Sequence, residues 1–380
     1  MRALSILVLL AACDNKDTDT KVDNSIAAFG NGSVSSVTLS VIGTGDDGLD
    51  VPRDLEFNPD VEGELWVVNR ADDSTTIFHA AGTSDQDSEH IVDPYALHFM
   101  EEVSSIAFGG VTYAGSDART FGTCQESRNT YNGFGSPNDF MGPSLWTADL
   151  DLYGKSNPEA VEYLTQLFGQ YADLGSHLDM LHESPLCMGM AWDYDNVYWV
   201  FDGSEDIIVR YDFAEDHDLG YDDHSDGIIS RYIDADVSRV EDVPSHMVLD
   251  PNTGLLYTAD TGNNRITVLD TTTGEEGDSL RAVERGTDHH EWVGADYSTL
   301  VSGSDVSGMD LPSGIALHDD ILFVSDNQNG MLLAFNLNGK LLDSLDLELD
   351  AGALMGIEVV GLDDIWVTDA INNEILRIQP

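Results

Sequence analysis

Basic residues are scarce in this sequence. Lys and Arg together number 16, against 70 Asp and Glu, and the formal net charge of the 380 residues is −54. A field of this sign repels the phosphate backbone of nucleic acids and the headgroups of anionic lipids. We therefore exclude nucleic acid as a partner and expect the acidic surface to serve solubility, high-salt surroundings or divalent cations.

Long apolar runs are also rare. Beyond the first ten residues, no segment approaches the roughly 20 apolar residues that a membrane-spanning helix needs. Met1 and Arg2 precede an apolar run over residues 3–10, which has the length of the core of a secretory signal. The run leads into a segment that resembles the lipobox of bacterial lipoproteins, namely Leu10, Ala11, Ala12 and Cys13.

The lipobox resemblance implies a division of the N-terminal region. Residues 1–12 are expected to be a signal peptide, Cys13 to carry the lipid, and residues 13–33 to form an acidic flexible tether. The protein would then belong to the bacterial cell envelope, with the lipid as its only contact with the membrane. The alternative is an ordinary secretory signal that happens to be followed by a cysteine.

Cysteine is limited to three residues. If lipid occupies Cys13, only Cys124 and Cys187 remain, and an exported compartment is oxidising. We predict a disulfide between these two residues. Two separate thiols are the alternative, because spacing along the chain does not establish proximity.

Several catalytic motifs are missing. The sequence contains no Gly-Xaa-Ser-Xaa-Gly elbow, no phosphate-binding loop and no dinucleotide-binding fingerprint. Hydrolase triads, kinases and Rossmann-type enzymes therefore have no support.

The sequence does contain a repeat. An aromatic or leucine-aromatic pair, two small or β-branched residues, and then Asp or Asn recur at 65–69, 145–149, 198–202, 256–260, 322–326 and 365–369. Short alternating runs precede each copy and follow most of them, which is typical of β-strands. Turn formers between the first and second runs make consecutive strands hairpin partners. We interpret the final Asp or Asn of each copy as a turn residue that accepts backbone N–H groups.

The repeat predicts the fold class. Small antiparallel sheets cannot bury both faces alone, whereas six of them packed around an axis can. We predict an all-β, six-bladed β-propeller of four-stranded antiparallel blades over residues 34–380. The last unit has only three strands, so we expect residues 34–42 to close the ring as the outer strand of the last blade. A seventh blade is the alternative.

The fourth copy of the repeat carries a family resemblance. Residues 244–270, with the run Asp-Thr-Gly-Asn-Asn-Arg-Ile over 260–266, resemble an NHL repeat. Residues 312–336 and 355–378 are looser copies that lack the arginine before the third strand. The resemblance implies an NHL-type propeller, and the gluconolactonase-like and YWTD propellers stay possible.

Extra chain lies between the repeats, and long loops on a rigid scaffold are the usual place for binding surfaces. The longest stretch, residues 109–144, is rich in Gly, Ser, Asn and aromatic residues and is predicted to form a lid or cap. Asn157 followed by Pro158 predicts the start of one short inserted helix. Its apolar face is expected to pack over blades 2 and 3 through Val161, Leu164, Phe168 and Tyr171.

Histidines near the starts of the innermost strands are candidate metal ligands. His246 stands at such a start, His98 and His182 precede two others by the same spacing, and Glu183 follows His182. Imidazoles that converge on the axis would suit zinc or copper with an open coordination position. The amidating lyase, a six-bladed NHL-type enzyme, holds its catalytic zinc with histidines from several blades, and that resemblance extends to His246 alone. The alternative is that these histidines are solvated or paired with carboxylates.

Two further clusters are weaker candidates. The carboxylates of Asp222, Asp223 and Asp226 suit calcium, although their spacing is not that of an EF-hand, and a solvated acidic loop is the alternative. His289 and His290 lie in a predicted insertion between blades 4 and 5. Adjacent strand residues face opposite ways, so only one of them can serve a given site.

These patterns predict an exported, lipid-anchored propeller that binds a ligand or a protein on the face with the long loops, with a divalent metal as an option. The alternative is a metal-dependent lyase or hydrolase resembling the peptidyl-hydroxyglycine amidating lyase. In it, His182 and His246 would bind zinc or copper, and residues 109–144 would exclude water. We expect a monomer.

Overall fold

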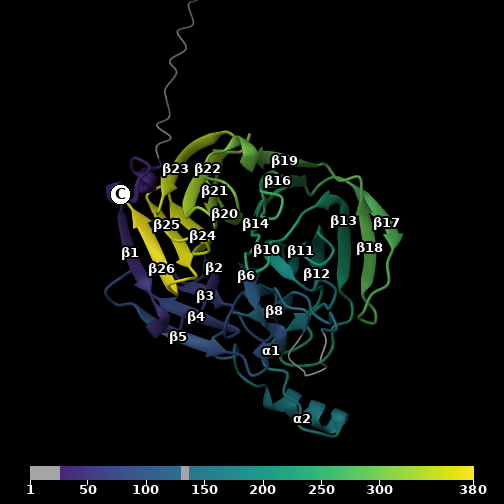
Figure 1. Cartoon of the computed structure of the whole chain (residues 1–380). Helices are drawn as coiled ribbons and strands as arrows, with labels where there is room; N and C mark the ends of the chain where they lie inside the picture. Colours follow the sequence, from purple (N-terminus) through teal and green to yellow (C-terminus); the bar gives the residue numbers. More distant parts are fainter. Residues whose placement is uncertain (1–25, 130–136) are drawn as a thin grey trace, which may run out of the picture.

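The computed structural model describes residues 26–129 and 137–380. The predicted signal peptide, Cys13, residues 13–25 of the predicted tether and residues 130–136 of the predicted lid lie outside the described residues. The described chain forms six sheets arranged around a central axis (Figure 1). This arrangement confirms the predicted six-bladed β-propeller.

In each blade four antiparallel strands pair side by side, and the strand that comes first in blades 1 to 5 lies nearest the axis. Blades 1 to 3 contain β2 (Pro52–Phe57), β3 (Leu65–Asn69), β4 (Ser74–His79) and β5 (Asp87–Val92); β6 (Val103–Phe108), β7 (Thr120–Gln125), β8 (Ser144–Thr147) and β9 (Asp179–Met180); and β10 (Cys187–Tyr194), β11 (Val197–Asp202), β12 (Ile207–Asp212) and β13 (Ile228–Asp236). Blades 4 to 6 contain β14 (Met247–Asp250), β15 (Leu255–Asp260), β16 (Arg265–Asp270) and β19 (Tyr297–Ser302); β20 (Pro312–His318), β21 (Ile321–Asp326), β22 (Met331–Asn336) and β23 (Leu341–Asp346); and β24 (Leu354–Gly361), β25 (Asp364–Asp369), β26 (Glu374–Gln379) and β1 (Thr38–Gly43).

The two ends of the propeller meet in blade 6. Strand β1 pairs antiparallel with β26, with Leu39 opposite Ile378. The N-terminal strand therefore closes the ring as predicted, although its first residues, Val34–Ser36, form the 3-10 helix η2. All strands of the described residues belong to the six sheets, so the alternative of a seventh blade is wrong.

The packed part of the chain begins before the predicted boundary at residue 34. A 3-10 helix, η1 (Ala27–Phe29), follows Ile26, and the side chains of Ile26, Ala28 and Phe29 are buried against blades 5 and 6. The Phe29 ring packs edge-on against Phe323, with 6.0 Å between ring centroids. The predicted tether, residues 13–33, therefore overlaps the packed part of the chain at Ile26, Ala28 and Phe29.

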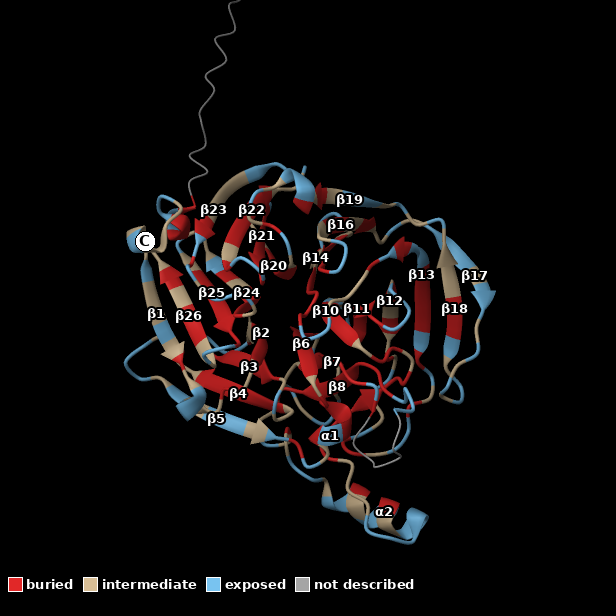
Figure 2. Ribbon diagram, viewed as in Figure 1, coloured by how far each residue is buried: buried red, intermediate tan, exposed pale blue. Residues whose placement is uncertain are grey.

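The large residue pair in each repeat fills both faces of its blade. Leu322 and Phe323 are adjacent on β21, so their side chains point to opposite sides. Leu322 joins the hydrophobic cluster toward blade 4 and Phe323 the cluster toward blade 6. Burying one such side chain stabilises the fold by about 1.5–3 kcal/mol. Figure 2 shows the consequence, with buried inner strands and more exposed outer strands such as β1, β5 and β17 (Glu275–Ser279).

In several repeats the final acidic residue holds the following turn, as predicted, whereas Asn69 and Asp260 accept N–H groups from other segments, those of Asp50 and Ser238. The Oδ1 atom of Asp202 accepts hydrogen bonds from the backbone N–H groups of Ser204 and Glu205, at 2.8 and 3.0 Å. Asp369 accepts from the N–H groups of Ile371 and Asn372, at 3.1 and 2.9 Å. These two carboxylates therefore stabilise turns within their blades.

Blade 2 departs from the predicted strand assignment. Its repeat copy at 145–149 lies largely on the third strand, β8, because β7 supplies the second strand from within the predicted lid, residues 109–144. Cys124 lies on β7 and bonds to Cys187 at the start of β10, with 5.2 Å between their Cα atoms. The predicted disulfide is thus confirmed, and it joins blades 2 and 3 rather than tethering a loop.

Blade 3 is wider than the others. Strand β18 (Asp288–Val293) pairs in parallel with β13, and β17 pairs with β18, so six strands form one sheet. The β17–β18 hairpin departs from blade 4 between β16 and β19 and returns to it. The predicted insertion between blades 4 and 5 is therefore wrong: it lies within blade 4 and packs on blade 3.

The predicted inserted helix is α2 (Pro158–Phe168), and the Asn157 side chain caps it by accepting from the N–H of Glu159. Its predicted packing face is wrong. Leu164 is buried, but Phe168 and Tyr171 are 49% and 73% exposed, because α2 projects from the ring (Figure 1). The other described helices are α1 (Ala96–Phe99) and the 3-10 helices η3 (Gly45–Asp47) and η4 (Gly303–Asp305). Among the described residues, no helix has the length and apolar character needed to cross a membrane.

Candidate functional site

An axial channel runs between the innermost strands. Its volume is about 270 Å³, and every blade contributes to its wall. The polar groups on the wall are the carboxyl groups of Asp54, Glu56 and Glu358 and the imidazole of His246. Small or apolar residues, such as Ala107 of β6, occupy the remaining wall positions.

The blades approach one another most closely where the innermost strands begin. A Cβ atom at Gly189 would lie 2.0 Å from the Ser245 carbonyl oxygen, so only glycine fits there. At the same level the Nε2 atom of His246 lies 3.1 Å from the Ser104 carbonyl oxygen. His246 is only 4% exposed, whereas Glu56 and Glu358 are partly exposed. Solvent therefore reaches the channel from the opposite end.

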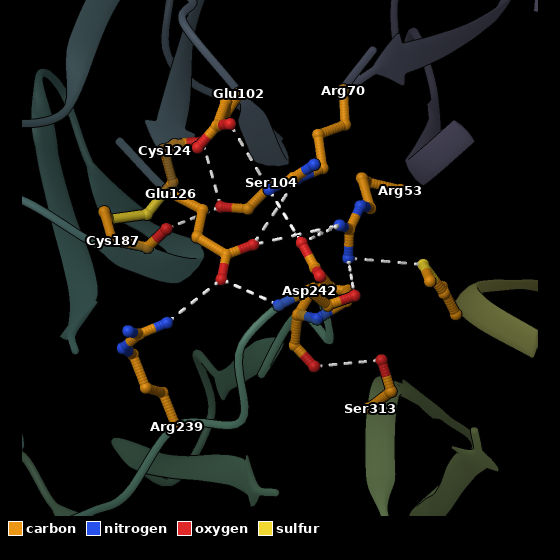
Figure 3. A network of polar contacts seen from close by, with 12 residues as sticks. Arg53, Arg70, Glu102, Ser104, Cys124, Glu126, Cys187, Arg239, Asp242 and Ser313 are labelled. Atoms are coloured by element: carbon orange, nitrogen blue, oxygen red, sulfur yellow. Dashed lines mark hydrogen bonds and ion pairs between the residues drawn. A yellow bond between two sulfur atoms is a disulfide. The ribbon is translucent and has the colours of Figure 1, made fainter. Parts of the chain in front are cut away.

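Beside the closed end of the channel, charged side chains form a network around the buried Arg53 and Glu126; Figure 3 shows this network. Glu126 lies among three guanidinium groups, with nearest nitrogen–oxygen distances of 3.8 Å to Arg53, 3.6 Å to Arg70 and 3.1 Å to Arg239. Burial lowers the pKa of Arg53 to about 10, which leaves it charged at neutral pH. Asp242 adds a second acid, 2.7 Å from Arg70. The network seals this end and holds blades 1 to 4 together.

The channel carboxyls have perturbed proton affinities. Burial and then the charge of nearby Asp54 raise the pKa of Glu358 to about 7. Burial and then Glu358 raise the pKa of Glu56 well above its ordinary value. Asp54 accepts hydrogen bonds from the Ser105 hydroxyl at 2.8 Å, and its Oδ1 lies 3.4 Å from His246 Nδ1. The open part of the channel is acidic and can hold protons or a cation.

A second cavity lies on the face of the ring where the innermost strands begin, which we call the loop face because residues 182–186, 203–205 and 280–283 lie there. This loop-face cavity has a volume of about 730 Å³. Its lining consists of Arg128, Asp139, His182, Glu183, Pro185, Leu186, Gly203, Ser204, Glu205, Arg231, Arg239, Leu280, Arg281, Val283 and His289.

Arg231 organises the wall formed by blade 3. Its guanidinium group donates to Asp202 at 2.8 Å, to the Glu183 carbonyl oxygen at 2.5 Å and to His289 Nε2 at 2.8 Å. Because His289 accepts at Nε2, its Nδ1 carries the proton, which it donates to the Arg281 carbonyl oxygen at 3.0 Å. The Glu183 carboxylate also accepts from the N–H of Val283. The hairpin is thereby fixed to blade 3.

Buried histidines lie beside this cavity. The Nε2 atoms of His98 and His182 are 3.2 Å apart, and His182 Nδ1 lies 2.5 Å from Glu284. The imidazole of His224 lies 5.4 Å from that of His182, centroid to centroid. Burial, followed by His182 and His224, lowers the pKa of His98 to about 3, and burial followed by His224 lowers that of His182 well below its ordinary value. The cluster is therefore neutral at physiological pH.

The structure brings some of the predicted metal residues together and separates others. His98 and His182 meet, but His246 lines the axial channel whereas His182 and Glu183 line the loop-face cavity. One metal ion held by His182 and His246 therefore has no geometric support. Within residues 26–129 and 137–380, no three His, Cys, Asp or Glu side chains are grouped closely enough to hold a metal ion.

The predicted calcium loop is engaged in local contacts. Asp223 accepts from the Ser225 hydroxyl at 2.8 Å, and Asp226 lies 3.1 Å from His217 Nε2. Asp222 is exposed. Asp223 and Asp226 each use one carboxylate oxygen in these contacts.

Sequence reasoning missed Asp54, Glu56 and Glu358. They lie within innermost strands, whereas the candidates chosen from the sequence precede those strands. A signal was present, because Glu56 and Glu358 occupy a position at which the aligned strands of three other blades have alanine, namely Ala107, Ala191 and Ala316.

Neither a protein-family model nor a curated protein matches this chain, so the NHL assignment stays a prediction. Solved structures do match in fold. A luciferin-regenerating enzyme is 12% identical with a TM-score of 0.52, over 90% of this chain and 95% of that one. Regucalcin from Agrobacterium tumefaciens, a calcium-binding protein, is 10% identical with a TM-score of 0.50, over 90% and 93%. An auxiliary nutrient-binding protein from Bacteroides ovatus is 11% identical with a TM-score of 0.49, over 90% and 76%. At these identities the likeness concerns the propeller fold alone.

Proposed function

We propose that this protein is a ligand-binding propeller that takes a small molecule into the loop-face cavity. The observation that carries the proposal is the cavity itself, which measures about 730 Å³ and is bounded by segments from blades 2, 3 and 4. Ligand sites in proteins have volumes of about 300–1,000 Å³ and combine apolar walls with a few convergent polar groups. Pro185, Leu186, Leu280 and Val283 supply the apolar part.

The cavity is also built to keep its shape. Arg231 ties three chain segments together, and the disulfide fixes the start of β10 beside it. A wall held by buried hydrogen bonds requires little ordering when a ligand binds, which favours affinity. This is the property expected of a binding module on a rigid scaffold.

Filling the cavity tests the proposal. Val283 lines it and is 55% exposed, so Val283→Trp adds bulk without disturbing the core. Ile371→Trp, at a position 52% exposed that does not line the cavity, is the matched control. A panel of small metabolites of all charge types is screened by thermal shift, since a ligand at 100 times its Kd stabilises the folded state by about 2.7 kcal/mol.

We expect at least one compound to raise the melting temperature of the wild type and of Ile371→Trp but not that of Val283→Trp. A panel without any stabilising compound, or stabilisation that survives Val283→Trp, would reject the cavity as the binding site.

The second candidate is a metal-dependent lyase or hydrolase in which His98 and His182 would supply two ligands to zinc or copper, with no third His, Cys, Asp or Glu grouped with them among the described residues. The observation that favours it is the 3.2 Å between their Nε2 atoms, close to the roughly 3.3 Å expected for two nitrogens on one tetrahedral zinc. Glu284 would orient His182, as carboxylates orient many metal-binding histidines. Elemental analysis of the purified protein tests it. Stoichiometric zinc or copper that is lost in His182→Ala supports the enzyme, and its absence from the wild type rejects it. The same analysis tests the proposed calcium at Asp222, Asp223 and Asp226.

We also propose that the chain is exported and anchored through a lipid on Cys13. The support from the folded part is the Cys124–Cys187 disulfide, because disulfides persist in oxidising compartments and are rare in the cytosol.

A further inference from the structure

We propose that the ligand of the loop-face cavity is a small organic anion whose carboxylate or phosphate group is bound by Arg281. This inference rests on the proposed function, and it names the chemical class of the ligand. Guanidinium groups bind such oxyanions through charge-assisted and often bidentate hydrogen bonds.

The first argument is where the scarce positive charge lies. The chain has 16 basic residues against 70 acidic ones, yet four arginines line this one cavity, beside three acidic residues. The axial channel shows the opposite pattern, with three carboxyl groups and neither Lys nor Arg on its wall. An anion approaching a protein of net charge −54 is repelled almost everywhere, so a site for it requires a basic group that no neighbouring carboxylate already neutralises.

The second argument is which guanidinium is available. Arg231 pairs with Asp202 at 2.8 Å, Arg128 with Asp139 at 2.6 Å, and Arg239 with Glu126 at 3.1 Å. Arg281 is exposed, and in the described part of the chain no carboxylate forms an ion pair with it. Three of the four arginines therefore have counter-charges, and the charge that a ligand can neutralise belongs to Arg281.

The third argument is that the backbone of Arg281 is held in place. Its carbonyl oxygen accepts from His289 Nδ1 at 3.0 Å, and the N–H of the preceding Leu280 donates to the His289 carbonyl oxygen at 2.7 Å. His289 in turn accepts from the buried Arg231. These contacts hold the backbone of Arg281 at the cavity and do not involve its guanidinium group.

Titration of the full folded chain with citrate and with inorganic phosphate, at constant ionic strength, tests the inference. Arg281→Gln should weaken binding of the anion at least about tenfold, because it removes the charged donor. The matched control is Arg285→Gln, which removes the same charge from an exposed position four residues away that does not line the cavity. We expect this control to bind within about twofold of the wild type.

The outcomes separate this inference from the proposed function. An equal loss of affinity in Arg281→Gln and Arg285→Gln would overturn the inference, because the effect would then come from overall charge. If a neutral or cationic compound binds to the wild type but not to Val283→Trp, the cavity is still the binding site. That result would overturn the inference that the ligand is an anion. If citrate and phosphate bind equally well to wild type and Arg281→Gln, Arg281 is not the anion site.

Discussion

Replacing Glu358 with glutamine should make the stability of this protein less dependent on pH. Glu358 lies on β24 in the axial channel, near Glu56 of β2 and Asp54. Its pKa is raised from 4.5 to about 7 in the folded protein, first by burial and then by Asp54. A folded carboxyl with a raised pKa retains a proton that the unfolded chain has released. The contribution of Glu358 to stability is therefore greatest below about pH 4.5 and is lost as the pH rises to about 7.

The size of the effect follows from the pKa shift. One pKa unit corresponds to 1.36 kcal/mol, so the ionisation of Glu358 costs about 1 kcal/mol of folding free energy at pH 5 and about 3 kcal/mol at pH 8. Glutamine resembles the protonated acid in shape and does not ionise. The substitution also removes the Glu358 charge that raises the pKa of Glu56. This change too should increase the stability of the folded protein at high pH.

Urea denaturation between pH 5 and pH 8, followed by tryptophan fluorescence, measures this difference. Glu358→Gln should exceed the wild type in unfolding free energy by about 3 kcal/mol at pH 8 and by about 1 kcal/mol at pH 5. Glu62→Gln, on the exposed turn between β2 and β3, should show no such trend. The reasoning fails if the gain of Glu358→Gln is the same at both pH values, or if the wild type is the more stable at pH 8.

Three further expectations concern the scaffold and the anchor. Asp202→Ala should lower the unfolding free energy by about 3–5 kcal/mol, measured by the same assay, because it leaves the buried Arg231 without its counter-charge; a loss below about 1 kcal/mol would contradict this. Removing the disulfide by the paired change Cys124→Ala and Cys187→Ala should cost about 4 kcal/mol, given the 63-residue separation, and a denaturing thiol assay of the unreduced wild type should find neither cysteine free. Cys13→Ser should move the protein from the membrane to the soluble fraction of the producing bacterium, and unchanged fractionation would argue against the lipid anchor.

Much of the scaffold was predictable because it is encoded locally. Alternating runs specify strands, and the large pair in each repeat specifies a blade with two buried faces, as Leu322 and Phe323 illustrate. Asn157 before Pro158 marked the start of α2 correctly. Two predictions about secondary-structure elements failed, one for the packing of α2 and one for the strands of blade 2. The apolar face of α2 has nothing to pack against beyond its first turns, and β7 was missed because it lacks the motif carried by the second strands of the other blades.

The candidate sites were less predictable, because their residues meet across long stretches of chain. His182 and Glu284 are separated by 102 residues, and His246 and Ser104 by 142. The spacing that His98 and His182 share placed them at corresponding points of neighbouring blades, where they do meet. The same reasoning joined His182 to His246, whereas the sealed end of the channel puts them in different cavities.

The sequence by itself therefore determined the six-fold repeat and the closing strand, since each depends on patterns within a few residues. It predicted the Cys124–Cys187 pair only on the expectation that lipid occupies Cys13. Only the tertiary structure decided that the β17–β18 hairpin of blade 4 would join blade 3 and bring Arg281 to a cavity beside Arg231. It likewise decided that Glu56 and Glu358 would face one channel. The physical reason is that a binding site is a meeting of side chains from distant segments, and that meeting is set by how whole sheets pack and not by the residues next to each one.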